Sequence, residues 1–439
     1  MSTLDGRDAR RARVAVSALF LVNGALIANV LPRLPAIKAQ LELTNAALGT
    51  AIAAMPVGGV LAGAAAGMLI VRYSSRRVTV GTGVAFGLLL GSIGLAPVWA
   101  SLAAAFLVLG MLDAVMDAAM NAHGIAVQRS YGRSILHGFH GWWSAGTLLG
   151  AGTGAVAAAL DVPLALHLAV VGLILAGVSV AALPLLLRGR DVDAAEAGEH
   201  GEHGAPGEPG DARRSVAGVS VAGGSVAGVS VAGSARRTAR LLGLLAPFAL
   251  VGILGVMLED AASTWSTIYL TDVLGAGVGV AALAVVLYTA GMTVGRLTND
   301  RWIDRWGDTT VARSGAVVAT IGLVLVVAAG SWAAVPLAAA GFGLVGLGTS
   351  PLFPVMISAA GTVPGVRAGE GVAVVAWLAR LGFVIAPTLV GLAADAIGLG
   401  AALIIPLVAG ATVALLMGPL LGASGRRTPA TAREVILDA

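Results

Sequence analysis

Apolar runs, each about as long as a membrane is thick, fill most of this 439-residue sequence. A helix that crosses the hydrocarbon core of a bilayer needs ~20 largely apolar residues, because the backbone must satisfy its own hydrogen bonds there. The runs lie near residues 14–31, 46–71, 78–97, 101–127, 139–159, 164–187, 241–270, 278–298, 311–329, 332–360, 369–394 and 399–421. The sequence therefore predicts an all-α integral membrane protein of about twelve transmembrane helices in two six-helix halves.

The composition argues against a water-soluble protein. Only 11% of the residues are charged and 57% are hydrophobic, whereas soluble domains carry ~25% charged residues. The chain has no cysteine, and Lys38 is its only lysine and follows no glycine-rich loop, so a phosphate-binding Gly-Lys-Ser/Thr motif is absent. We therefore expect no enzyme, no nucleotide-driven pump, no cofactor and no metal. The basic residues do not form one stripe, so we expect no nucleic acid partner.

The middle of the chain differs from both halves. Glu, His, Gly and Pro concentrate in residues 188–240, and the sequence SVAGVSVAG at 215–223 recurs at 225–233. A repeat without aromatic or long apolar side chains cannot bury a core, which indicates a flexible linker. We therefore divide the chain into an N-terminal half, 1–187, the linker, and a C-terminal half, 241–439.

The basic residues also predict an orientation. Of the 27 Lys and Arg residues, 24 fall in the termini, the linker and alternate loops, including Arg296 in the loop after the eighth span. The other side has only Arg33 and Lys38, and Arg380 lies inside a span. Cytoplasmic loops of membrane proteins are enriched in Lys and Arg. Both termini and the linker should therefore face the cytoplasm.

The fourth span carries a polar stripe. Asp113, Asp117 and Asn121 repeat every four residues, so they share one face of a helix. An ionisable group inside a span costs ~2.5–3.5 kcal/mol, which makes each one a candidate functional residue. The stripe either lines the bundle interior, with a transport role for a carboxylate, or only forms hydrogen bonds between helices.

The seventh and eleventh spans carry further charges. Glu259 should line a cavity, while Asp260 points ~100° away and is either a pore group or a structural partner. Arg380 lies near the middle of its span. It needs either a permanent ion pair with Asp113, Asp117 or Glu259, or a role in binding substrate.

Polar and aromatic residues in the first and fifth spans complete the candidates. Asn23 and Asn29 lie on different faces, and either amide could bind a hydroxylated solute or hold helices together. His140 and Trp143 share a face at i+3, which allows a stacking or protonatable contact. Trp142 has the character of an interfacial anchor.

The layout resembles that of the major facilitator superfamily. Two sets of six spans flank a long linker, and the loop after the eighth span ends in Asp-Arg-Trp-Gly at residues 304–307, similar to the D-R-x-G element of that superfamily. The loop after the second span departs from the element, with Val71-Arg72-Tyr73-Ser74. The resemblance implies alternating access, with a gating loop built from Asp300, Arg301, Asp304 and Arg305.

Shorter segments resemble the fucose permease branch of sugar and proton symporters. These are Asp117 to Asn121, residues 350–354 (SPLFP), and Glu259 followed by Trp265 and Ser266. In that branch the carboxylate of the acidic-x-x-x-Asn element is a proposed proton carrier. An amide near Asn29 stands where the symporters have an acidic residue.

From this resemblance we expect a secondary active transporter of a small solute, such as a sugar or another polar metabolite, with proton coupling. Asp117 is the first candidate for coupling, followed by Asp113 and Glu259. The expected substrate-binding residues are Asn23, Asn29, Asn121, His140, Trp143, Trp265 and Arg380. We expect a monomer in a bacterial plasma membrane. The alternatives are an efflux antiporter for cationic compounds and a receptor that uses the same fold without transport.

Overall fold

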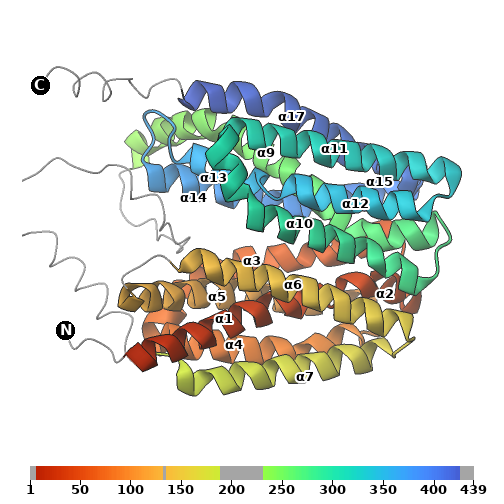
Figure 1. Ribbon diagram of the computed structural model, residues 1–439, viewed down its shortest axis with the longest axis horizontal. Helices are drawn as coiled ribbons and strands as arrows, with labels where there is room; N and C mark the ends of the chain where they lie inside the picture. Colours follow the sequence, from red (N-terminus) through yellow and green to blue (C-terminus); the bar gives the residue numbers. More distant parts are fainter. Residues whose placement is uncertain (1–5, 132–134, 188–230, 426–439) are drawn as a thin grey trace, which may run out of the picture.

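The computed structural model describes residues 6–131, 135–187 and 231–425. Within these ranges the chain is built from helices and connecting turns, without a β-strand. The helices form two bundles that lie side by side, one from each half of the chain (Figure 1). The predicted all-α fold with two helical halves is confirmed.

The first half runs from α1 to η3. Its helices are α1 (Gly6–Ala28), η1 (Leu31–Arg33), α2 (Leu34–Gln40), α3 (Asn45–Tyr73), α4 (Ser75–Leu90), η2 (Gly91–Ile93), α5 (Trp99–Tyr131), α6 (Leu136–Ala159), α7 (Leu164–Ala182) and η3 (Leu183–Leu185).

The second half runs from α9 to α17. Its helices are α9 (Val231–Asp272), α10 (Val278–Trp306), α11 (Asp308–Trp332), α12 (Val335–Thr349), α13 (Leu352–Ala360), α14 (Ala368–Ala379), α15 (Leu381–Ile397), α16 (Leu399–Ala402) and α17 (Ile404–Gly425).

Ten helical segments of the described chain are long and apolar enough to cross a membrane. The predicted spans that do not reach this standard are α4 and α6. Helix α4 has only 16 residues, and α6 carries His, Trp, Ser, Thr and several Gly residues that lower its hydropathy. Both still pack within the first bundle, α4 against α5 and α7, and α6 against α1.

Two boundaries differ from the sequence-based expectation. Helix α9 begins at Val231, so residues 231–240 of the expected linker are helical, while residues 188–230 lie outside the described ranges. Helix α10 continues to Trp306 and ends at Gly307, whose φ of +79° glycine adopts at little cost.

The four residues expected in a gating loop, Asp300, Arg301, Asp304 and Arg305, therefore lie on the last two turns of α10. Arg296 is also helical, ten residues before the end of α10, and not in a loop. Arginine is a good helix former, and charged side chains are solvated where a helix leaves the membrane, so the helix outlasts the apolar run.

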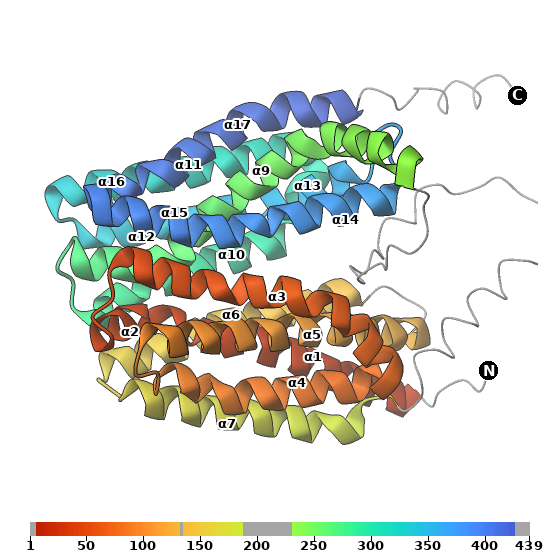
Figure 2. The ribbon, with the colours of Figure 1, turned by 180° about the vertical axis from the view of Figure 1, so that it is seen from behind.

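The described ends of the chain lie at one end of the molecule, beside the ends of α7 and α9 that border residues 188–230 (Figure 1). Each half therefore begins and ends at the same end of the molecule, with its helices running along the long axis. Contacts between the halves are made by α6 with α10 (Figure 1) and by α3 with α15 (Figure 2).

Two glycines bring together the helices that carry the polar side chains. A Cβ at Gly24 of α1 would collide with the backbone oxygen of Trp143 in α6, and a Cβ at Gly110 of α5 would collide with the backbone oxygen of Met55 in α3. Small residues permit this close packing of helices in membranes. Helices α1 and α6 are thereby held close enough for their side chains to form hydrogen bonds.

Candidate functional site

A chain of four side chains links the two halves. Arg296 of α10 lies over the ring of Trp143 of α6, 5.0 Å from its centroid. The indole Nε1 of Trp143 donates to Oδ1 of Asn23 at 2.8 Å, and Nδ2 of Asn23 donates to Oδ1 of Asp113 at 3.0 Å. Helices α1, α5, α6 and α10 thus each contribute one member of this polar relay.

The relay fixes how its amide is oriented. Asn23 is 4% exposed, and its oxygen and its nitrogen each have one partner. Because an amide has one acceptor oxygen and one donor nitrogen, the indole donor and the carboxylate acceptor allow only this orientation. The sequence indicated Asn23, Trp143 and Asp113 as separate candidates, and the structure brings all three together.

Asp117 lies one turn further along α5. Nδ2 of Asn121 donates to Oδ1 of Asp117 at 3.0 Å and to its backbone oxygen at 2.9 Å. This contact confirms that the two residues share a helical face. The charges of Asp113 and Asp117 also act on each other, so the polar stripe of α5 is one electrostatic unit.

Arg380 of the second half acts on this unit from a distance. Its charge interacts with both Asp113 and Asp117, but among the described residues it forms no direct ion pair. It lies between α14 and α15, where the helix is interrupted. Arg380 is exposed, so its charge acts on the two carboxylates without contact.

Glu259 is placed near the relay by α9. It lines a small pocket of about 10 Å³ between α9, α12 and α13, together with Gly255, Thr349, Leu352 and Met356. Arg296 interacts electrostatically with Glu259. The same arginine therefore lies over an aromatic ring of the first half and acts on a carboxylate of the second.

Asp260 and Trp265 are more deeply buried than their neighbour Glu259. Asp260 is 4% exposed and accepts a hydrogen bond from Thr264 at 2.8 Å through Oδ1. In the described structure, Oδ2 of Asp260 and Nε1 of Trp265 form no hydrogen bond of good geometry. The indole of Trp265 nevertheless lies close enough to Asp260 to act on its carboxylate. Trp265 is fully buried, so its expected contact with substrate would require movement of α9.

The remaining candidates lie apart from the relay. Asn29 is 1% exposed, donates to the backbone oxygen of Ala25 at 2.7 Å and accepts from Thr153 at 2.8 Å, so it joins the end of α1 to α6. His140 packs edge-on against Phe20, with ring centroids 5.3 Å apart.

The contact of Arg296 with Trp143 was not predicted from the sequence, because the loop count placed Arg296 in a solvent-exposed loop. Its position was nevertheless within the predicted eighth span, 278–298, and this was the signal available. In the described residues, no group of three or more His, Asp and Glu side chains is placed to hold a metal ion.

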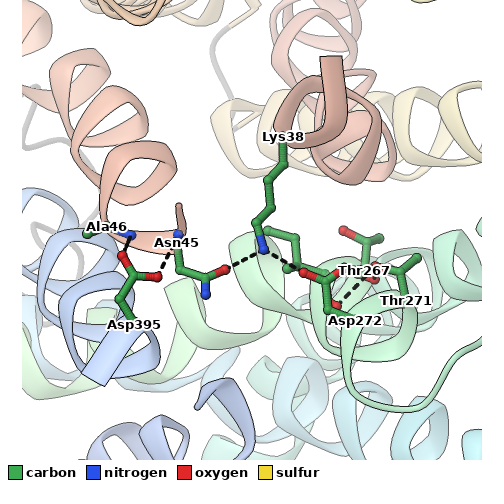
Figure 3. A network of polar contacts seen from close by, with 8 residues as sticks. Lys38, Asn45, Ala46, Thr267, Thr271, Asp272 and Asp395 are labelled. Carbon is green, nitrogen blue, oxygen red and sulfur yellow. Dashed lines mark hydrogen bonds and ion pairs between the residues drawn. The ribbon is translucent and has the colours of Figure 1, made fainter. Parts of the chain in front are cut away.

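A second polar network joins the halves (Figure 3). It includes residues of α2, which lies at the end opposite the termini (Figure 2). Nζ of Lys38 in α2 lies 2.5 Å from Oδ2 of Asp272 in α9 and 2.7 Å from Oδ1 of Asn45 in α3. Asp395 of α15 accepts from the backbone N–H groups of Asn45 at 2.9 Å and Ala46 at 3.0 Å. This far-end network connects the two halves at that end.

The sequence profile of the Major Facilitator Superfamily matches residues 16–279 and 248–435. The chain belongs to this superfamily. It is 30% identical over 387 residues to an uncharacterized transporter of Sinorhizobium fredii, covering 87% of this chain and 90% of that one. It is also 26% identical to the membrane protein MosC of Rhizobium meliloti, covering 91% and 88%.

Solved structures of the superfamily share the fold. The D-xylose-proton symporter superposes with a TM-score of 0.68 at 12% identity, covering 96% of this chain and 99% of that one. The nucleoside transporter NupG gives 0.65 at 12% identity, covering 94% and 98%. This major facilitator protein is accordingly a multi-pass membrane transporter, and its polar relay and far-end network lie where its two halves meet.

Proposed function

We propose that the protein is a secondary active carrier that moves a small hydroxylated solute by alternating access, coupled to protons. The observation that carries the proposal is the relay of Arg296, Trp143, Asn23 and Asp113, which crosses from one half to the other within the membrane. In carriers of this kind the site near the bilayer midplane lies between the repeats that move against each other.

The chemistry of the relay suits a polar solute. It offers a carboxylate acceptor, an amide, an indole ring and a guanidinium within one connected set of contacts. Hydroxyl groups can both donate and accept hydrogen bonds, so they can replace the contacts that the relay makes with itself. The apolar face of a sugar-like ring can pack on an indole. These features support the sugar-like class implied by the resemblance to fucose permeases.

Proton coupling is proposed for the carboxylates of α5, with Asp117 first and Asp113 and Glu259 next. Asp117 hydrogen bonds to Asn121 on its own helix and experiences the charge of Arg380 from the other half. Movement of one half past the other changes the distance between Arg380 and Asp117. The affinity of Asp117 for a proton then depends on the facing state, which links the proton to the solute.

The far-end network supports an assignment of state. It holds the halves together at the end opposite the termini. With the termini in the cytoplasm of a bacterial cell, as the basic residues indicate, this end faces outward. The structure then corresponds to a carrier closed to the outside, and we propose a monomer in the inner membrane.

Flux through the purified protein in proteoliposomes tests the proposal. Candidate solutes come from a thermal shift panel of sugars and related polyols set against cationic amphiphiles, since ligands of the native state raise its stability. We expect a sugar-like solute to stabilise the protein and to accumulate when a proton gradient is imposed. Stabilisation by the amphiphiles alone would favour the efflux alternative, and binding without flux would favour the receptor.

A further inference from the structure

A groove separate from the relay opens on α1 near the termini. Its volume is about 540 Å³. Helix α1 supplies most of its lining, with Tyr131 at the end of α5 and Trp142 near the start of α6. The residues of α1 are Arg10, Arg13, Val14, Ser17, Ala18 and Leu21. We refer to this feature as the α1 groove.

The α1 groove opens on the outer surface of the first half. Trp142, Leu149 and Val156 are 50, 53 and 60% exposed and follow one another along a single face of α6, and Leu160, directly after the helix, is 70% exposed. An apolar face exposed along a whole transmembrane helix is in contact with lipid. The next residue, Trp143, points instead toward Arg296 and the other half. The groove therefore opens toward the bilayer and not toward the substrate site.

The lining of the groove changes from charged to apolar along α1, as the headgroup and acyl chains of a phospholipid do. Arg10 and Arg13 lie at its mouth, and Val14, Ala18 and Leu21 follow along α1. From Arg10 to Leu21 the helix rises roughly 16 Å at ~1.5 Å per residue, which is about the thickness of one leaflet. Trp142 and Tyr131 lie beside the arginines, where aromatic residues anchor membrane proteins at the lipid headgroups.

The positive charge of the α1 groove comes from Arg10 and Arg13. Both are exposed, and Arg13 lies over the ring of Tyr131, 5.6 Å from its centroid. In the described structure, neither guanidinium forms an ion pair with a carboxylate. Two cations at the mouth of a groove whose remaining lining is mostly apolar complement a phosphate group at the head of acyl chains.

We propose that the α1 groove binds one anionic phospholipid of the cytoplasmic leaflet. Arg10 and Arg13 hold its phosphate, and an acyl chain lies along Val14, Ala18 and Leu21. The assignment to that leaflet rests on the proposed orientation. Leu21 is two residues from Asn23, so a bound lipid braces the part of α1 that carries the relay. The lipid therefore stabilises the packing of α1 against α6.

Native mass spectrometry of the full chain tests the proposal. The detergent-solubilised protein is titrated with phosphatidylglycerol and, separately, with phosphatidylcholine of the same acyl chains. The test variant is Arg10→Gln with Arg13→Gln. The control is Arg77→Gln with Arg313→Gln, which removes the same charge from two other exposed arginines in the part of the chain near the termini. A basic residue near anionic lipid contributes about fivefold in binding.

We expect one tightly bound phosphatidylglycerol on the wild type and on the control, and binding at least about tenfold weaker on the test variant. Equal binding by the test and control variants would overturn the proposal, as would equal binding of the two lipids by the wild type. If the test variant does not fold, Val14→Glu, which obstructs the chain-binding wall, replaces it and is expected to weaken binding similarly. Unchanged binding by Val14→Glu contradicts the proposal.

A further experiment replaces the lipid with inorganic phosphate. It has the charge of the headgroup but no acyl chain, so we expect it neither to displace the lipid nor to raise the melting temperature as phosphatidylglycerol does. Equal stabilisation by phosphate would show a plain anion site and overturn the lipid assignment. The binding measurement requires no transport, so its failure is distinct from failure of the proposed function.

Discussion

Lys38 and Asp272 meet across the two halves, with Nζ and Oδ2 2.5 Å apart, although 234 residues separate them in the sequence. Their side chains are 17% and 40% exposed, so the pair lies at the edge of the interface. Lys38 also donates to Asn45 at the start of α3, next to the backbone groups that Asp395 accepts from. The single lysine of the chain thus connects three helices at the end opposite the termini.

Loss of the Lys38 charge should shift the carrier toward the outward-open state. A partly exposed ion pair contributes ~0.2–1 kcal/mol, so Lys38→Met should raise the open population roughly 1.5- to 5-fold. Because the native chain has no cysteine, a single Thr267→Cys reports opening. Thr267 is fully buried and its hydroxyl lies 3.4 Å from the backbone oxygen of Leu31 across the interface.

The measurement is the rate of labelling by a membrane-impermeant maleimide. Lys38→Arg, which keeps the charge, is the control and should label at nearly the wild-type rate. An unchanged rate for Lys38→Met would show that the pair does not hold the far end closed.

Asp395 should hold the same end closed by a different contact. Its carboxylate accepts from two N–H groups in the first turn of α3, at 2.9 and 3.0 Å, and so caps a helix of the other half. Removing a capping side chain costs ~0.5–2 kcal/mol. Asp395→Ala should therefore raise labelling of Thr267→Cys roughly 2- to 30-fold, and Asp395→Asn, which keeps an acceptor, should raise it less. Equal effects of the two substitutions would argue against a capping role.

Asp117→Asn should separate solute movement from proton movement. The amide keeps the size of the carboxylate and one acceptor oxygen for Asn121, but it cannot titrate. We expect exchange of solute down its own gradient to persist, while proton-driven accumulation falls to the level of equilibration. Glu42→Gln, an exposed change at the far end, should leave both unchanged. Accumulation by Asp117→Asn with an unaltered pH profile would transfer the coupling role to Asp113 or Glu259.

Trp143→Phe should weaken solute binding through Asn23. Phenylalanine keeps a ring beneath Arg296 but has no N–H to donate to Oδ1 of Asn23. A hydrogen bond of this kind contributes ~0.5–1.5 kcal/mol, so the KM for the solute should rise roughly 2- to 12-fold with a smaller change in kcat. Trp142→Phe is the neighbouring control, because Trp142 is half exposed on the outer face. An equal rise in KM for both variants would place the effect outside the relay.

The polar stripe on α5 shows which contacts residue spacing can predict and which it cannot. Spacing of four residues predicts that Asp117 and Asn121 share a face, and their 3.0 Å contact confirms it. Spacing could not predict that Asn23 bonds to Asp113, because those residues are 90 positions apart on different helices. It also could not show that Arg380 acts on two carboxylates without touching either.

The sequence by itself determined that the chain spans a membrane in two helical halves, since the length and apolarity of each run are local properties that a bilayer selects directly. Only the tertiary structure decided which polar groups meet. Arg296 reaches Trp143 because α10 packs beside α6, and Lys38 reaches Asp272 because the halves close at the far end. Such contacts depend on how whole helices approach one another, and no local periodicity encodes that approach.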